Sequence, residues 1–341
     1  MGRRYMSSER RSIRTDSILL TAGLLLIAYF LGEVLLLVFA AVVLAVGLDG
    51  LSSAIARRTP LSRGWALLVI SISIFSFIIA VASLSAGRLV MQLQDVSEAV
   101  VEFAEQAHDW LTGLGVMQEE DDENGGLASA VRDMSGQALT WGMTALGAIT
   151  SFVILVVLTG FIAVNPALYR GGSLRLVPPA KRGIAEDTLS ALAHALRWWF
   201  LGQLVSMALL GVSVGLGLFV LGIELWLGLA VLTALLTFIP FIGPLIAAVP
   251  VIAVGFAAGM QTGLIVLAGY LVIQNLEGSV VNPLIQQRAV NLAPALLIAV
   301  QVLLSLVFGV MGLILAAPLT IVGMVAVQKL WVEHTLGERI T

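Results

Sequence analysis

Amide side chains gather in residues 274–294, a stretch that lies between long apolar runs. Its polar members are Gln274, Asn275, Glu277, Asn282, Gln286, Gln287, Arg288 and Asn291. Amides donate and accept hydrogen bonds without carrying a charge. They therefore match a small polyhydroxylated molecule better than a charged pocket would.

Glu277 is the one acid in this stretch. A carboxylate at the end of an apolar helix is costly to hold ionised in lipid, so reversible protonation is expected there. Glu277 is therefore the candidate for coupling transport to a proton. The alternative is a structural role, in which Glu277 reaches the lipid headgroups or pairs with Arg288. Arg288 and Asn291 would then only shape the loop.

Proline and glycine interrupt the apolar run 225–260 at Pro240, Gly243 and Pro244. A broken membrane helix leaves backbone groups unpaired, which is tolerated only where protein or a water-filled cavity satisfies them. A polar solute would supply such partners, whereas the alternative is a hydrated surface loop. We group these residues with Gln301 in a predicted solute or ion pathway, and expect Gly243→Leu to spare folding but abolish transport.

The composition predicts an all-α integral membrane protein. Of 341 residues, 59% are hydrophobic and only 11% are charged, too few to cover a soluble surface. The apolar runs are continuous and much longer than the strands of a membrane barrel. With no cysteine, three scattered histidines and no nucleotide-binding or nucleophile motif, we expect no metal, no cofactor and no enzymatic activity. The dispersed basic residues also argue against nucleic acid as a partner.

Charge distribution predicts the topology. Basic residues cluster within the segments 1–16, 56–63 and 165–199, which the positive-inside rule places in the cytoplasm. Between residues 88 and 140 two bases stand against eleven acids, so we place that segment outside. We expect a multi-pass protein of the bacterial inner membrane with both termini cytoplasmic.

These patterns predict about eight membrane helices or segments. The expected parts are a basic N-terminus (1–16), N-terminal membrane helices (17–87, with a hairpin at 17–47 and a span at 64–87), an acidic extramembrane helical hairpin (88–140), a span (141–164), a connector with an interfacial helix (165–199), a transport core (200–330) and a tail (331–341).

Three apolar runs are too long for one straight crossing. The run 17–47 is interpreted as two short helices turning near Gly32, with a single tilted helix as its rival. The runs 225–260 and 295–328 favour broken or re-entrant hairpins. Their helix breakers are Pro240, Gly243, Pro244 and Pro250 in the first, and Gly309, Gly312 and Pro318 in the second.

Two further patterns concern packing. Apolar residues from 89 to 114 follow a heptad, which fits either a seam between subunits of a homo-oligomer or packing within one chain. The pairs Gly211/Gly215 and Gly255/Gly259 have the spacing that lets membrane helices approach closely. They predict helix contact rather than chemistry.

Several short segments together resemble the autoinducer-2 exporter family of bacterial membrane proteins. They are IPFIGP at 239–244 with Pro250, QNLE at 274–277 with Asn282 and Pro283, LAP at 292–294, FGVMG at 308–312, and Ala317 with Pro318. The resemblance covers nearly the whole chain and implies a multi-span exporter of the inner membrane. Members have been linked to efflux of the autoinducer and, in some lines, to exchange of sodium or lithium for protons.

Three functions stay open on the sequence. The first is a secondary transporter exporting a small polar solute, with autoinducer-2 as a candidate. The second is a sodium (lithium)/proton antiporter, for which the candidate carboxylates are Glu33, Asp49, Glu224 and Glu277. The third is a scaffold without transport activity. The expected partners are the lipid bilayer, a small polar solute, a proton or sodium ion, and further copies of the chain.

Overall fold

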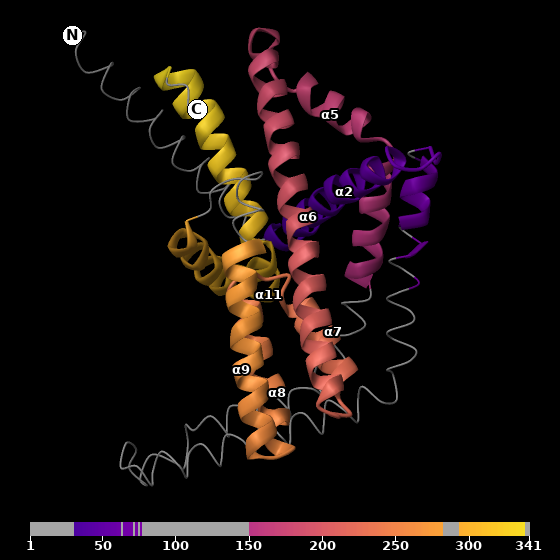
Figure 1. The fold of residues 1–341 in the computed structure, drawn as a ribbon. Coiled ribbons are helices and arrows are strands. Elements are labelled where there is room, and N and C mark those ends of the chain that lie inside the picture. Colours follow the sequence, from indigo (N-terminus) through magenta and orange to yellow (C-terminus); the bar gives the residue numbers. More distant parts are fainter. Residues whose placement is uncertain are drawn as a thin grey trace, which may run out of the picture.

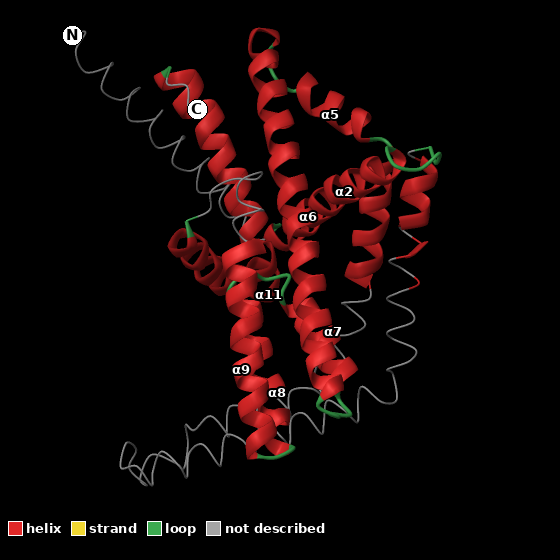
Figure 2. Ribbon diagram, in the orientation of Figure 1, coloured by secondary structure: helices red, strands yellow, loops and turns green. Residues whose placement is uncertain are grey.

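The structure is a computed structural model that describes residues 31–62, 64–70, 72–73, 76, 150–281 and 293–337. This part of the chain is helical and contains no strand (Figure 2). Its main elements are a helix at Thr150–Val164, α2 (Gly32–Ala56), α5 (Pro166–Arg175), η2 (Pro179–Lys181), α6 (Arg182–Val220), α7 (Trp226–Leu236), α8 (Ile242–Ala257), α9 (Met260–Leu276), η3 (Glu277–Val281), α11 (Pro294–Ala326) and η4 (Val327–Leu336).

Three of the described helices are long and apolar enough to cross a membrane. They are α2, α6 together with η2, and α11 together with η4. A fourth is reached if Thr150–Val164 and α5 count as one bent span. The chain is therefore a helical membrane protein. The expected total of about eight membrane helices or segments stays a prediction. Residues 17–30, most of 64–87 and the whole acidic hairpin 88–140 lie outside the described residues.

Helix α6 is the longest of the described α-helices, and α2, α7, α9 and α11 contact it, whereas α8 packs on α7 and α9 (Figure 1). Helix α7 leaves the end of α6, and α8 returns to the same end before α9 begins (Figure 1). At about 1.5 Å per residue, α7 and α8 are roughly 16 and 24 Å long, less than the roughly 30 Å of a bilayer core. The break between them, residues 237–241, therefore lies partway along α6.

Helix boundaries differ from the sequence interpretation in three places. Helix α2 begins near the predicted turn at Gly32 but continues to Ala56, beyond the expected end at residue 47. The predicted interfacial helix and the following span form one continuous helix, α6, because the residues around 199–200 include no proline or capping residue. Pro250 and Pro318 lie inside α8 and α11 without ending them.

The predicted break in 295–328 occurs at Gly309. Its backbone angles, φ 59° and ψ −144°, are not helical and divide α11 into two arms. Gly312 permits the close contact between the arms, since a Cβ there would lie 2.0 Å from the carbonyl oxygen of Leu304. Glycine is the residue that both geometries favour.

An ion pair joins α2 to α6 away from the break. The guanidinium of Arg197 donates to a carboxylate oxygen of Asp49 at 2.6 Å, and the Asp49 side chain is mostly buried. Beside it lies a core cluster that includes Val43, Trp199 and Phe200. Breaking a partly buried pair leaves an uncompensated charge, so this contact fixes which faces of α2 and α6 meet.

Small residues allow α6 and α7 to approach closely. A Cβ at Gly211 would lie 2.8 Å from the Cβ of Ala234, and one at Gly215 would lie 2.8 Å from the Cβ of Ala230. The predicted contact at Gly211 and Gly215 is thus present. Close approach matters here because dispersion contacts hold membrane helices together where lipid is as apolar as the side chains.

Gly211→Ile is expected to separate α6 from α7 and to lower the free energy of unfolding by about 1–3 kcal/mol, because overpacking shifts the backbone. Gly217→Ile is the matched control on the same helix, since nothing lies within 4 Å of the position its Cβ would occupy. Thermal unfolding in detergent, followed by the monodisperse fraction on size exclusion, measures both. Equal melting curves for the two variants would contradict the assigned contact.

Candidate functional site

The break between α7 and α8 follows from two prolines four residues apart. In a continuous helix, the N–H of residue 240 would bond to the carbonyl of Leu236, and that of residue 244 to the carbonyl of Pro240. Proline has no N–H, so both carbonyls lose their helical partners. The Leu236 oxygen instead accepts from the N–H of Ile239 at 2.9 Å.

A tight turn at Phe241 carries the chain into α8. Phe241 has φ 65° and ψ −57°, and the Ile242 N–H donates to the Pro240 oxygen at 2.8 Å. This three-residue turn is rare, and a positive φ at a side-chain-bearing residue stores strain. Such strain persists only where surrounding contacts over-determine the conformation.

Side chains from three other helices supply those contacts. Gln203 of α6 donates through Nε2 to the carbonyl of Thr237, and Tyr270 of α9 donates its hydroxyl to the carbonyl of Pro244. Gln301 of α11 donates through Nε2 to the carbonyl of Pro240 at 2.9 Å. The broken backbone is therefore bonded to α6, α9 and α11 at once.

Gln301 also leaves one polar atom without a partner. Its side chain is 0% exposed, and its Oε1 has no hydrogen bond in the structure. A buried acceptor without a donor costs about 1–3 kcal/mol. The atom lies on the same amide that bonds to the break, so a donor placed beside the break would satisfy it.

A row of polar side chains on α9 and at the first residue of η3 continues the site. Tyr270, Gln274 and Glu277 are spaced by four and three residues, which places them on one helical face. The buried Nε2 of Gln274 lies near the Tyr270 hydroxyl but does not reach hydrogen-bond geometry. The Ser206 hydroxyl, one turn from Gln203 on α6, donates to Glu277 Oε1 at 2.8 Å.

The sequence profile described as AI-2E family transporter matches residues 18–331, nearly the whole chain. The chain belongs to this family. It is a membrane transport protein by family, and the break described above lies within the matched region.

Individual relatives of this AI-2E family member carry transport names. The chain is 27% identical over 262 residues to YrrI of Bacillus subtilis, a provisional transport protein, covering 74% of this chain and 72% of the relative. It is 38% identical over 100 residues to the AI-2 transport protein TqsA of Escherichia coli, covering 28% of each. A provisional transport protein of Mycobacterium tuberculosis is 27% identical, covering 79% of this chain and 73% of the relative.

The structure brings together six of the residues predicted for the pathway. Gln301, Pro240, Gly243 and Pro244 meet at the break, and Gln274 and Glu277 line the adjacent face of α9. Asn275 lies elsewhere: it is exposed and donates to the carbonyl of Leu271 on its own helix. Asn282, Arg288 and Asn291 fall outside the described residues.

Sequence reasoning missed Gln203, Ser206 and Tyr270 as members of the site. A signal for Gln203 and Ser206 was present, since polar residues in an apolar run that crosses a membrane point to the protein interior. Nothing in the sequence indicated which segment they face. Tyr270 gave no signal, because tyrosine is equally common at a membrane interface.

The four candidate carboxylates have different surroundings. Glu33 and Glu224 are exposed, and Asp49 is paired with Arg197. Glu277 faces Ser206. Of the four, Glu277 is the carboxylate that bonds to a side chain one turn from Gln203, which bonds to the break.

An apolar groove of about 400 Å³ lies beside the break, between α6, α8 and α9. Its lining includes Val214, Leu218, Val251 and Val266. Such a lining offers few hydrogen bonds, so it does not suit a polar solute. The polar atoms of the break and of α9 suit such a solute better.

The expectation that leucine at Gly243 would leave the fold intact is wrong. A Cβ at this position would lie 1.8 Å from the backbone oxygen of Leu236, so α7 and α8 would have to move apart. Even Gly243→Ala is expected to disturb the break and lower the melting temperature. Gly269→Ala on α9 is the control, because no atom lies within 4 Å of its Cβ position.

Circular dichroism melts of the two purified alanine variants in one detergent compare them directly. Equal melting temperatures for Gly243→Ala, Gly269→Ala and the unchanged protein would contradict the close approach of Gly243 to Leu236.

Proposed function

We propose that this chain is a secondary transporter of the bacterial inner membrane that exports a small, neutral, polyhydroxylated solute. The observation that carries the proposal is the unpartnered Oε1 of Gln301, buried beside the broken backbone of the α7–α8 hairpin. A hydroxyl group of a solute is a donor and would satisfy that atom. Broken helices are also where secondary transporters commonly bind their solutes.

The side chains that reach the break favour a neutral solute over an ion. They are two amides and a phenol, so none carries a charge at neutral pH. Gln301 and Gln274 together present an acceptor and a donor without partners. The name of the relative TqsA makes autoinducer-2 the first solute to test. In this proposal the chain has no enzymatic activity and both termini are cytoplasmic.

Gln301→Met in proteoliposomes tests the site. Methionine keeps the length of the side chain but removes both amide groups, so efflux of autoinducer-2 is expected to fall at least about tenfold, the equivalent of one lost hydrogen bond to a bound solute. Gln261→Met, at an exposed position in the first turn of α9, is the matched control. Folding is checked for both by size exclusion.

Two results would count against the proposal. Unchanged efflux in a folded Gln301→Met protein would remove Gln301 from the solute path. Absence of efflux in the unchanged protein, for every polyhydroxylated solute and gradient tried, would favour a scaffold without transport activity.

A sodium (lithium)/proton antiporter is the second candidate, and the contact between Ser206 and Glu277 favours it. This contact places a carboxylate one turn from Gln203, which bonds to the break. A carboxylate inside a membrane domain is a common element of proton relays. Antiport would need Glu277 to exchange its proton as the cation binds.

Glu277→Gln tests whether Glu277 carries a coupling proton. Glutamine keeps the size of the side chain and an acceptor for the Ser206 hydroxyl but cannot titrate. If Glu277 carries the proton, efflux continues while its response to an imposed pH gradient is lost. Wild-type efflux with wild-type pH dependence would assign Glu277 a structural role.

A further inference from the structure

Helix α5 turns sharply away from the helix that precedes it. The axes of Thr150–Val164 and α5 differ by 85°, with only Asn165 between them. Pro166 cannot donate to a helical carbonyl, and the Asn165 side chain accepts from the Leu168 N–H at 3.4 Å to start the new helix. Many side chains of Thr150–Val164 are apolar and exposed, as expected for a helix facing lipid. If Thr150–Val164 crosses the membrane, a helix nearly perpendicular to it lies along the membrane surface.

One face of α5 carries exposed apolar side chains. Leu168 is 64% exposed, Tyr169 is 43% exposed, and Leu176, just after the helix, is 87% exposed. Helical spacing places these three side chains on the same side. An exposed apolar patch of this kind marks an interaction surface rather than ordinary solvent-facing helix.

Basic residues border this apolar face. Arg170, Arg175, Lys181 and Arg182 lie between residues 165 and 185, and that segment has no Asp or Glu. Within the described residues, Arg175 and Lys181 are exposed and form no ion pair. Exposed lysine and arginine beside exposed leucine and tyrosine are complementary to an anionic lipid surface.

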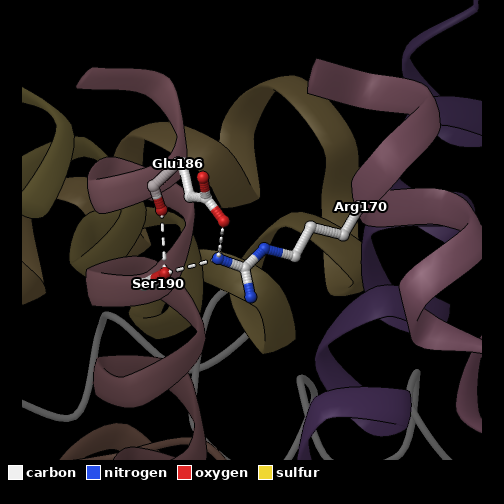
Figure 3. Close-up of polar contacts among 3 residues, drawn as sticks. All are labelled: Arg170, Glu186 and Ser190. Carbon is white, nitrogen blue, oxygen red and sulfur yellow. Dashed lines mark hydrogen bonds and ion pairs between the residues drawn. The ribbon is translucent and has the colours of Figure 1, made fainter. Parts of the chain in front are cut away.

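Arg170 has a different role, because it fixes the orientation of α5 relative to α6. Its guanidinium donates from Nη2 to Glu186 Oε1 at 3.1 Å and to Ser190 Oγ at 2.9 Å, both on α6 (Figure 3). The Ser190 hydroxyl in turn donates to the Glu186 carbonyl (Figure 3). This contact holds one side of α5 on α6, so Leu168, Tyr169 and Leu176 face outward.

We propose that α5 and η2 form a binding surface for anionic phospholipid headgroups. Leu168, Tyr169 and Leu176 enter the boundary between headgroups and acyl chains, while Arg175 and Lys181 bind lipid phosphates. The surface is separate from the break between α7 and α8, and it does not depend on which solute the protein carries.

The test is a spin label at Leu176→Cys in the full chain, which has no native cysteine. The protein is reconstituted in vesicles of phosphatidylcholine alone, or of phosphatidylcholine and phosphatidylglycerol in equal parts. In the anionic vesicles the label is expected to collide with oxygen and to be shielded from a water-soluble nickel chelate. A label at Asp187→Cys, exposed on α6, is expected to show the opposite and also reports folding.

Charge removal tests headgroup recognition itself. Each base near an anionic surface contributes about 1 kcal/mol, so Arg175→Gln with Lys181→Gln should lower the ratio of docked to undocked α5 roughly thirtyfold. The control, Arg57→Gln with Arg58→Gln, changes net charge equally at another exposed site and should leave the ratio unchanged.

Three outcomes would overturn the proposal. In the first, the label at position 176 collides with the nickel chelate in both vesicle types. In the second, the label is docked equally in both vesicle types. In the third, the label is shielded from oxygen as well as from the chelate. The last would mean that protein rather than lipid covers α5.

Discussion

The need to satisfy a broken backbone inside the membrane domain organises this structure. Pro240 and Pro244 remove two helical hydrogen bonds, and lipid offers no replacement. Gln203, Tyr270 and Gln301 donate to carbonyls at or beside the break from three separate helices. The same bonds therefore satisfy the backbone and fix the positions of α6, α9 and α11 around it.

This constraint also explains why α6 and α7 pack closely. The hairpin must lie close to α6 for Gln203 to reach the Thr237 carbonyl, and Gly211 and Gly215 permit that distance. Gly243 permits the matching approach of α8 to the end of α7. A side chain at any of these glycines would lengthen the hydrogen bonds that the break requires.

In the proposed function, structure and solute binding draw on the same side chain. The amide of Gln301 uses its donor on the backbone and leaves its acceptor unpaired, so one side chain both holds the break and faces whatever occupies it. Movement of α11 relative to the hairpin would change both contacts together. In the proposed transporter, such shared contacts would link solute occupancy to helix position, which alternating access requires.

The sequence by itself determined the membrane class, the helical fold and the position of the break. Apolar runs, proline spacing and glycine act through local rules: a proline removes its hydrogen bond wherever the helix packs. Local rules also located Gln274, Glu277 and Gln301 as polar residues in apolar surroundings.

Only the tertiary structure decided which polar side chains meet. Gln203 and Gln301 are separated in sequence from the carbonyls they satisfy by 34 and 61 residues, and Arg197 from Asp49 by 148. The continuity of α6 through residue 200 and the outward position of Asn275 likewise depend on neighbouring helices. Partner choice between helices is set by packing geometry, which hydropathy and residue spacing along one chain do not contain.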